Sequence, residues 1–118
     1  MSSIYPSSTP EVARKRRELT PRQVDGFEAF SKTVFVDGAL SAKFKQIIAV
    51  AVAHVTQCPY CIRGHTKAAL RAGAAPEELM EAAWVAAEMR AGGAFAHSTV
   101  MLATLAEEQM NPDRRSVP

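Results

Sequence analysis

The segment from Ile47 to Ala53 constrains the fold of this chain more than any other, because it is apolar on every side. It lies in a longer stretch, from Ser41 to about Val55, that is too long and too rich in alanine for a strand and therefore predicts a helix. A helix that is apolar all round lies either in the middle of a protein or against another subunit. Both placements are open from the sequence, and the second would fit a homo-oligomer.

Helix-start signals recur on both sides of that segment, and no part of the chain alternates between apolar and polar residues as a strand would. Thr9-Pro10 marks the start of one helix, and Thr20 with Gln23 predicts a capping box at the start of the next. Asp37-Gly38 ends that second helix. Its apolar residues recur at helical spacing and predict a stripe that faces a core: Val24, Phe27, Phe30 and Val34.

Three more helices are predicted after the central one. They run from the cysteines to Gly73, from Pro76 to about Arg90, and from Ala94 to about Glu108, with Gly92-Gly93 breaking or kinking the path between the last two. Trp84 is expected to point inward. The sequence therefore predicts an all-α bundle of about six helices.

The length of 118 residues suits one domain, with 47% hydrophobic and 22% charged residues as in a soluble globular protein. We expect a flexible lead-in over 1–8, a single helical domain over 9–108 and a polar tail over 109–118. Alanine-rich helices bury little apolar area each, which favours a homo-oligomer. The net charge of +2 suggests no nucleic-acid partner, and the absence of a secretory signal or a membrane-length apolar run favours the cytoplasm.

The sequence Cys58-Pro59-Tyr60-Cys61 is the clearest chemical motif. Pro59 at the first helical position would place Cys58 at the N-cap and Cys61 two residues after Pro59, so that both thiols lie in the first turn. Free N–H groups and the helix dipole stabilise a thiolate there. In a chain without a signal, this spacing indicates redox chemistry in which one cysteine attacks and the other resolves, with no organic cofactor.

Two histidines flank the cysteines at matching distances. His65 lies four residues after Cys61, on the same helix face, where its imidazole can take the thiol proton. His54 lies four residues before Cys58 and either faces the site across the turn or is a core histidine. A Cys2His2 zinc site is an alternative, but structural zinc normally joins separate chain segments, and we expect no metal. His97 is more typical of a structural position.

The stretch from Lys43 to His97, about half of the chain, resembles the alkylhydroperoxidase AhpD-like core of the carboxymuconolactone decarboxylase family. The resemblance rests on an apolar helix, CxxC, a histidine four residues on, a helix ended by glycine and an alanine-rich helix started by proline. It implies an all-α fold, a trimer or hexamer, and thiol-dependent reduction of hydroperoxides. It also implies that Cys61 attacks, Cys58 resolves and His65 belongs to a proton relay.

Two positions depart from the family pattern. A glutamate that completes the relay is replaced by Gln46, whose amide cannot accept a proton at neutral pH. The histidine that often precedes the second cysteine is replaced by Tyr60. We therefore expect a relay that is shorter, or that ends at another group such as His54, and peroxidase activity that is weaker than dithiol–disulfide exchange.

The two cysteines compete for the attacking role. Helix-end electrostatics favour Cys58, while the family pattern and the spacing to His65 favour Cys61, which we predict to attack because a base within reach decides proton removal more directly. The expected substrate is a hydroperoxide or a disulfide, and the family resemblance implies a lipoyl- or thioredoxin-like dithiol as the electron donor. The alternatives are a carboxymuconolactone-type decarboxylase, whose chemistry needs no thiol pair, and a non-enzymatic redox sensor.

Overall fold

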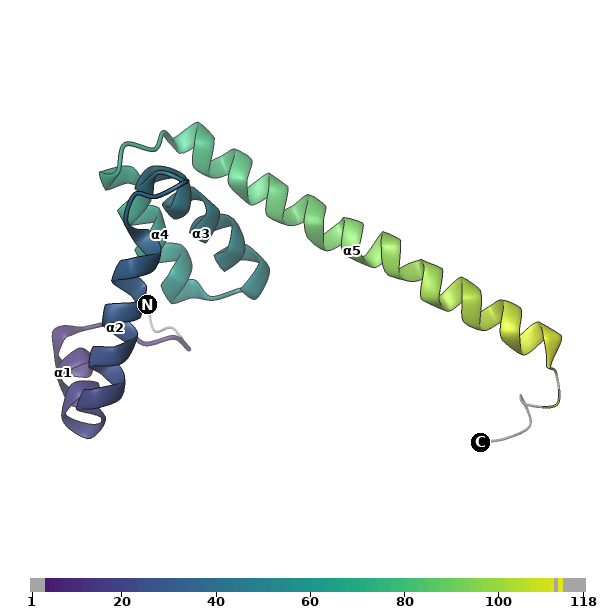
Figure 1. Cartoon of the computed structure of the whole chain (residues 1–118), viewed down its shortest axis with the longest axis horizontal. Coiled ribbons are helices and arrows are strands. Elements are labelled where there is room, and N and C mark those ends of the chain that lie inside the picture. The colour runs from purple at the N-terminus through teal and green to yellow at the C-terminus, as the bar shows by residue number, and fades with distance from the viewer. Residues whose placement is uncertain (1–3, 112, 114–118) are drawn as a thin grey trace.

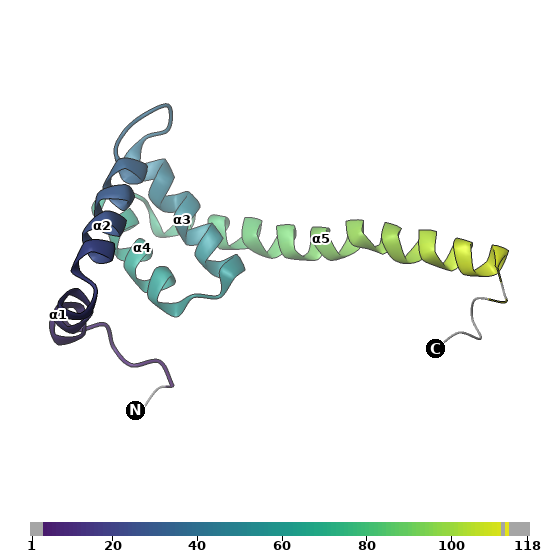
Figure 2. The ribbon, with the colours of Figure 1, turned by 60° about the horizontal axis from the view of Figure 1, so that its bottom comes forward.

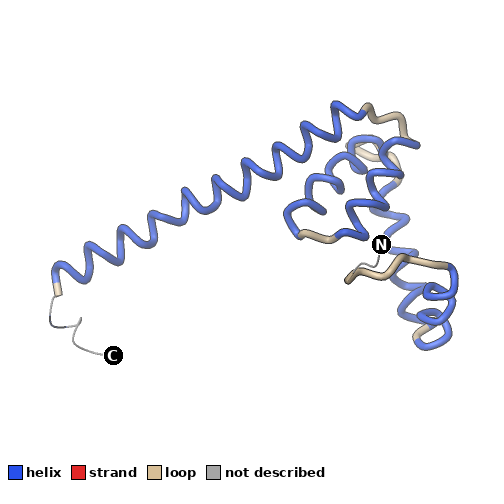
Figure 3. The backbone as a smooth tube through the Cα atoms, turned by 180° about the vertical axis from the view of Figure 1, so that it is seen from behind, coloured by secondary structure: helices blue, strands red, loops and turns tan. Residues whose placement is uncertain are grey.

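The computed structural model describes residues 4–111 and 113, and its regular structure in those residues is helical, without strands (Figures 1 and 3). The helices are α1 (Pro10–Leu19), α2 (Pro21–Phe35), α3 (Ala42–Thr56), α4 (Pro59–Arg71) and α5 (Pro76–Met110). This confirms the all-α prediction. The other residues of the predicted lead-in and tail, 1–3, 112 and 114–118, lie outside the described part of the chain.

Local signals set most of the helix ends. The Thr9 hydroxyl accepts the Val12 N–H at 3.3 Å, and the Ser41 hydroxyl accepts the Phe44 N–H at 3.1 Å, so each satisfies a backbone donor that its helix leaves unpaired. Gly73 follows α4 with φ of +97°, the left-handed conformation that ends many helices. These starts and this stop are as predicted.

The capping box predicted for Thr20 and Gln23 is wrong. Thr20 alone separates α1 from α2, and its hydroxyl donates to the Arg16 carbonyl at 3.1 Å. Its backbone N–H bonds to the same oxygen at 3.0 Å. The threonine thus caps the end of α1, and α2 begins with Pro21 and no side-chain cap.

The break predicted at Gly92-Gly93 is also wrong, because α5 continues through both glycines as one helix of 35 residues. A glycine inside a helix costs only about 1 kcal/mol relative to alanine, and strong helix formers flank the pair. The helix leaves the cluster of α3 and α4 and projects away from it (Figures 1 and 2). None of the described helices combines the length and the apolar character needed to cross a membrane.

The centre of the fold is α3, which packs against α4 and the first part of α5. The buried cluster is small and consists of Val50, Ala69 and Ala74, with Ile47 and Leu79 packed against it. An ion pair of 3.2 Å joins Lys43 to Glu78 and connects the starts of α3 and α5. The all-round apolar helix is therefore central, which is one of the two placements that the sequence left open, but a single chain covers only part of it.

Many large apolar side chains that were expected to face a core are exposed in the single chain. Trp84 is 67% exposed, Phe27 on α2 is 70% exposed and Phe95 on α5 is 82% exposed. The radius of gyration is 21.2 Å, compared with about 13 Å for a compact domain of similar length. The prediction that Trp84 points inward is therefore wrong for the single chain, because Ala82 and Ala86 form the buried face of α5 and Trp84, between them in the sequence, lies on the exposed face.

Candidate active site

The turn between α3 and α4 places the two cysteines. Gln57 adopts the left-handed conformation, with φ of 58°, and turns the chain so that Cys58 becomes the N-cap of α4. Pro59 occupies the first helical position. The N–H of Cys61 donates to the Cys58 sulfur at 3.3 Å, so that the sulfur takes the role that a serine oxygen has in other caps. Both thiols are free, and the predicted placement at the helix start is confirmed.

The two thiols share a proton unequally. A hydrogen bond from the Cys61 thiol, followed by the backbone N–H groups of Cys61 and Tyr60, lowers the pKa of Cys58. The pKa of Cys61 is raised, first because its thiol proton is held by the Cys58 sulfur, and then by partial burial and the nearby charge of Cys58. In the reduced protein Cys58 is therefore the cysteine that forms a thiolate more readily, as helix-end electrostatics alone suggested.

Cys61 opens into a cleft of about 520 Å³ between α2, α3 and α4. His65 lies one turn beyond Cys61 on α4 and lines the same cleft, as the four-residue spacing predicted. The His65 ring stacks on Phe35 with 5.1 Å between ring centroids and 27° between planes. The full lining is Ser31, Lys32, Phe35, Gln46, Tyr60, Cys61, Gly64, His65 and Ala68.

Gln46 holds His65 through its side-chain oxygen, which lies 2.8 Å from His65 Nδ1. An amide oxygen can only accept, so Nδ1 donates and carries the proton of the neutral ring. The other ring nitrogen, Nε2, then keeps a lone pair and is the basic atom of the imidazole. Gln46 thus orients the histidine even though it cannot take a proton from it.

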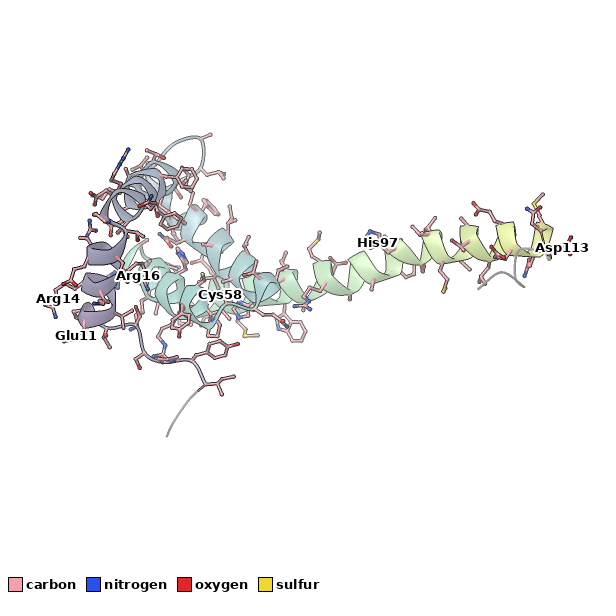
Figure 4. All side chains as sticks on the ribbon, turned by 90° about the horizontal axis from the view of Figure 1, so that it is seen from below. Glu11, Arg14, Arg16, Cys58, His97 and Asp113 are labelled. Carbon is pink, nitrogen blue, oxygen red and sulfur yellow. The ribbon has the colours of Figure 1, made fainter. Side chains whose placement is uncertain are left out.

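The structure places His54 and His97 away from this cleft. His54 Nδ1 lies 2.7 Å from the Val50 carbonyl of its own helix. The ring lines a separate cleft of about 610 Å³ on another side of α4, together with Gln57 and Ile62. His97 is exposed on the projecting part of α5, far along the helix from Cys58 (Figure 4).

Tyr60, between the cysteines, connects the site to the N-terminal segment. Its hydroxyl donates to the Pro6 carbonyl at 2.7 Å, and its ring meets the Tyr5 ring edge-on at 6.1 Å between centroids.

Within the described residues, no group of three or more His, Cys, Asp or Glu side chains is placed to hold a metal ion.

Sequence reasoning missed Phe35 and Lys32 as residues of the cleft. Phe35 and Lys32 lie three residues apart on α2, so one helix face brings both to the site, but neither belongs to a chemical motif. The pattern of α2 predicted Phe27 and Phe30 as the inward face instead. The only signal was position, because α2 ends close to the start of α3.

The family comparison agrees with this arrangement. The model of the carboxymuconolactone decarboxylase family matches residues 21–104, which include α2, α3, α4 and most of α5. The chain belongs to this family. Its helical core is the AhpD-like domain that carries CxxC at the start of α4.

Two curated relatives of this carboxymuconolactone decarboxylase family protein match most of its length. "Uncharacterized protein 4 in cox locus" from Paracoccus denitrificans is 65% identical over 83 residues, which are 70% of this chain and 75% of the relative. An uncharacterized protein from Cupriavidus necator is 35% identical over 86 residues, which are 73% of this chain and 76% of that protein. Neither name states an activity.

Solved structures share the fold. A carboxymuconolactone decarboxylase family protein from Legionella pneumophila, crystallised in the apo form, is 35% identical with a TM-score of 0.64, covering 67% of this chain and 70% of its own. A protein from Methanobacterium thermoautotrophicum is 37% identical with a TM-score of 0.67, covering 71% and 94%. A Thermotoga maritima protein at 22% identity, with a TM-score of 0.64 and coverage of 93% and 99%, shows the fold alone.

Proposed function

We propose that this protein is a dithiol–disulfide oxidoreductase that reduces hydroperoxides with Cys58 and Cys61, assisted by His65. The observation that carries the proposal is the placement of both thiols in the first turn of α4, with the Cys61 N–H on the Cys58 sulfur at 3.3 Å. Two cysteines so placed can close a disulfide with little backbone movement. The Cys61 thiol, and then the backbone N–H groups at the helix start, lower the pKa of Cys58, which suits Cys58 to the resolving step in which its thiolate attacks the Cys61 sulfur.

Cys61 is the proposed attacking residue because it lines the cleft that also holds His65. His65 Nε2 takes the thiol proton, and the Cys61 thiolate then attacks the terminal oxygen of the hydroperoxide. The O–O bond breaks, Cys61 becomes a sulfenic acid, and the leaving alkoxide takes the proton back from His65. Cys61 is oxidised by two electrons and the hydroperoxide is reduced to an alcohol.

Cys58 then resolves the intermediate. Its thiolate attacks the Cys61 sulfur, the S–O bond breaks, and the hydroxide that leaves is protonated to water. An external dithiol of the lipoyl or thioredoxin class reduces the resulting disulfide by two successive exchanges and is itself oxidised to a disulfide. A reducing compartment such as the cytoplasm keeps the pair in its dithiol form between turnovers.

His54 takes no part in these steps, because its cleft is separate from that of Cys61. The relay in this proposal is therefore the shorter of the two that the sequence suggested, with His65 as the base and Gln46 as the residue that positions it. Compared with the glutamate of the family pattern, the neutral amide of Gln46 lowers the driving force for proton transfer to His65. We therefore expect peroxidase activity to be weaker than dithiol–disulfide exchange.

The serine variants of the two cysteines test this proposal. Reduced protein is mixed with cumene hydroperoxide and a sulfenate trap, and is then assayed for turnover with dithiothreitol. Cys61→Ser abolishes peroxide consumption, while Cys58→Ser stops turnover and leaves a trappable sulfenate on Cys61. A trappable sulfenate in Cys61→Ser and none in Cys58→Ser would reverse the roles. One stoichiometric oxidation of the wild type without turnover would favour a redox sensor instead.

A carboxymuconolactone-type decarboxylase is the second candidate, favoured by Lys32. This lysine lines the cleft and forms no ion pair with any described residue, so it is available to a substrate carboxylate. Such a reaction needs neither thiol. Decarboxylation of a carboxymuconolactone at an unchanged rate by the variant with both cysteines replaced by serine would support this candidate over the redox enzyme.

We also infer that the working form is a homo-oligomer, with the trimer or hexamer that the family resemblance suggests. The single chain exposes 9600 Å², whereas a compact protein of 12.8 kDa exposes about 6300 Å². Large apolar side chains account for much of the α5 surface, among them Trp84, Phe95 and Leu102. Interfaces of permanent oligomers bury areas of this order and are similarly apolar. Sedimentation velocity tests the inference, and a monomer at micromolar concentration would refute it.

A further inference from the structure

We propose that one face of α4, formed by Arg63, Lys67 and Arg71 and here called the basic stripe, is the docking surface for the electron donor. The donor that fits this surface is a protein domain or peptide segment that carries its dithiol beside acidic residues. This inference rests on the proposed function, since it concerns how the same disulfide is reduced.

The basic stripe is one continuous row of cations. Its members lie four residues apart on α4, so they project from the same side of the helix at successive turns. All three are exposed. The 13 residues of α4 contain no Asp or Glu, and none of the three cations forms an ion pair with a described residue.

Several basic residues elsewhere in the chain are paired with acidic side chains. Arg17 is held by Asp25 and Glu28, and Lys43 is paired with Glu78. The net charge of the whole chain is only +2, so the positive potential of α4 is local. A local row of unpaired like charges is costly for stability and attracts a partner of opposite charge.

The basic stripe begins at the redox pair. Arg63 follows Cys61 by two residues. Arg63 and Lys67 line both the His54 cleft of about 610 Å³ and a further cleft of about 520 Å³, which the N-terminal segment with Tyr5 and Pro6 also lines. Both clefts reach Pro59, which lies directly after Cys58, and neither lining contains an acidic residue. A segment that lies along the basic stripe therefore reaches Pro59, the residue next to Cys58, and the second cleft adjoins the Cys61 cleft at Tyr60 and Gly64.

In this proposal the two substrates approach the dithiol from neighbouring clefts. The hydroperoxide enters the cleft of Cys61 and His65, and the donor approaches along the basic stripe toward Cys58. A dithiol group has no charge at neutral pH, so the cations must recognise the residues that flank it. Acidic flanks would be steered to the helix and would raise the association rate in a manner that salt suppresses.

The test uses two reduced peptides that each carry dihydrolipoyl-lysine, one flanked by four glutamates and the other by four glutamines. The protein is first oxidised to the Cys58–Cys61 disulfide, and stopped-flow measurement gives the second-order rate of its reduction by each peptide. We expect the wild type to prefer the acidic peptide by about tenfold at low ionic strength, with the preference lost at high salt. Combined Arg63→Gln, Lys67→Gln and Arg71→Gln substitutions should remove the preference and leave reduction by dithiothreitol unchanged.

A matched control neutralises three cations elsewhere, by Arg14→Gln, Lys15→Gln and Arg16→Gln on α1, and should keep the preference. Equal rates for the two peptides in the wild type would overturn the inference. The inference would also be overturned if the control variant lost the preference for the acidic peptide and the basic-stripe variant kept it. A third contrary result is that the basic stripe binds a nucleic acid or anionic vesicles while the protein shows no preference between the two peptides. The Cys58–Cys61 disulfide is formed with diamide, so the experiment needs no hydroperoxide. A protein that fails to turn over peroxide can therefore still show the peptide preference, and the two failures are distinguishable.

Discussion

Replacing Gln46 by glutamate is the sharpest test of the proposed relay. Gln46 Oε1 accepts a hydrogen bond from His65 Nδ1 at 2.8 Å, and a glutamate of nearly the same shape would place a carboxylate oxygen at that position. The substitution changes charge while keeping the contact. If His65 takes the Cys61 proton, its ring becomes positively charged during the reaction, and the carboxylate stabilises that charge where the amide does so weakly.

The expected gain comes from the difference between two kinds of hydrogen bond. A neutral hydrogen bond contributes about 1 kcal/mol, while one to a charged group contributes about 1.5–3 kcal/mol. The difference of about 1 kcal/mol corresponds to a rate increase of roughly fivefold when the charge is fully developed in the transition state. His65 is half-buried and stacks on Phe35, so solvent screens the new pair only in part.

The measurement is the second-order rate of oxidation of the reduced protein by cumene hydroperoxide, quenched with an alkylating reagent and analysed by mass spectrometry. Gln46→Glu should raise this rate by about fivefold. The same change in a His65→Gln background should have no effect, since no imidazole remains to be stabilised. A rate for Gln46→Glu within the error of the wild type, or an equal increase in both backgrounds, would refute the relay through His65.

Four further substitutions have expected outcomes. Cys61→Ala removes the thiol that donates to the Cys58 sulfur, so the pKa of Cys58 should rise and its alkylation by iodoacetamide near neutral pH should slow, as a pH profile of the rate will show. Ser41→Ala removes the cap of α3 and should lower the free energy of unfolding in urea by about 1 kcal/mol. Thr20→Ala should cost less, because that hydroxyl accepts no N–H from α2. Trp84→Glu should dissociate the oligomer in sedimentation velocity.

Each of these outcomes has a contrary result. Unchanged or faster alkylation of Cys58 in Cys61→Ala would show that the shared proton is not what lowers the pKa. If Thr20→Ala lowers the free energy of unfolding as much as Ser41→Ala does, the Thr20 hydroxyl stabilises its helix end as strongly as the Ser41 hydroxyl stabilises the start of α3. An assembly that persists in Trp84→Glu, with the wild-type sedimentation coefficient, would place the interface away from the exposed face of α5.

Local sequence determined the helix starts and the position of the dithiol. At Thr9-Pro10 and Cys58-Pro59, a hydroxyl or a sulfur accepts a backbone N–H of the first helical turn, and the proline that follows has no N–H to satisfy. These contacts lie within one turn and do not depend on distant parts of the chain. The same reasoning placed His65 beside Cys61, because residues four apart on a helix share a face. It failed at Thr20, where two helices compete for one hydroxyl.

Only the tertiary structure decided which helix faces meet. The pairing of Gln46 with His65 spans 19 residues of sequence, and the stack of Phe35 on His65 joins α2 to α4. His54 has a spacing from Cys58 that matches that of His65 from Cys61, but the turn at Gln57 sends its side chain to another cleft. Spacing along the chain determines neighbours on one helix only, and the rotation of one helix against another depends on packing.

The length of α5 was likewise decided by the whole helix rather than by its two glycines. Two residues of low helix propensity did not interrupt 35 residues in which good helix formers predominate. The composition did determine that the chain has a small core, because alanine buries little area, and the structure showed where the uncovered apolar surface lies. Sequence thus determined the chemistry at the start of α4, and the packing of α2, α3 and α4 decided which side chains surround it.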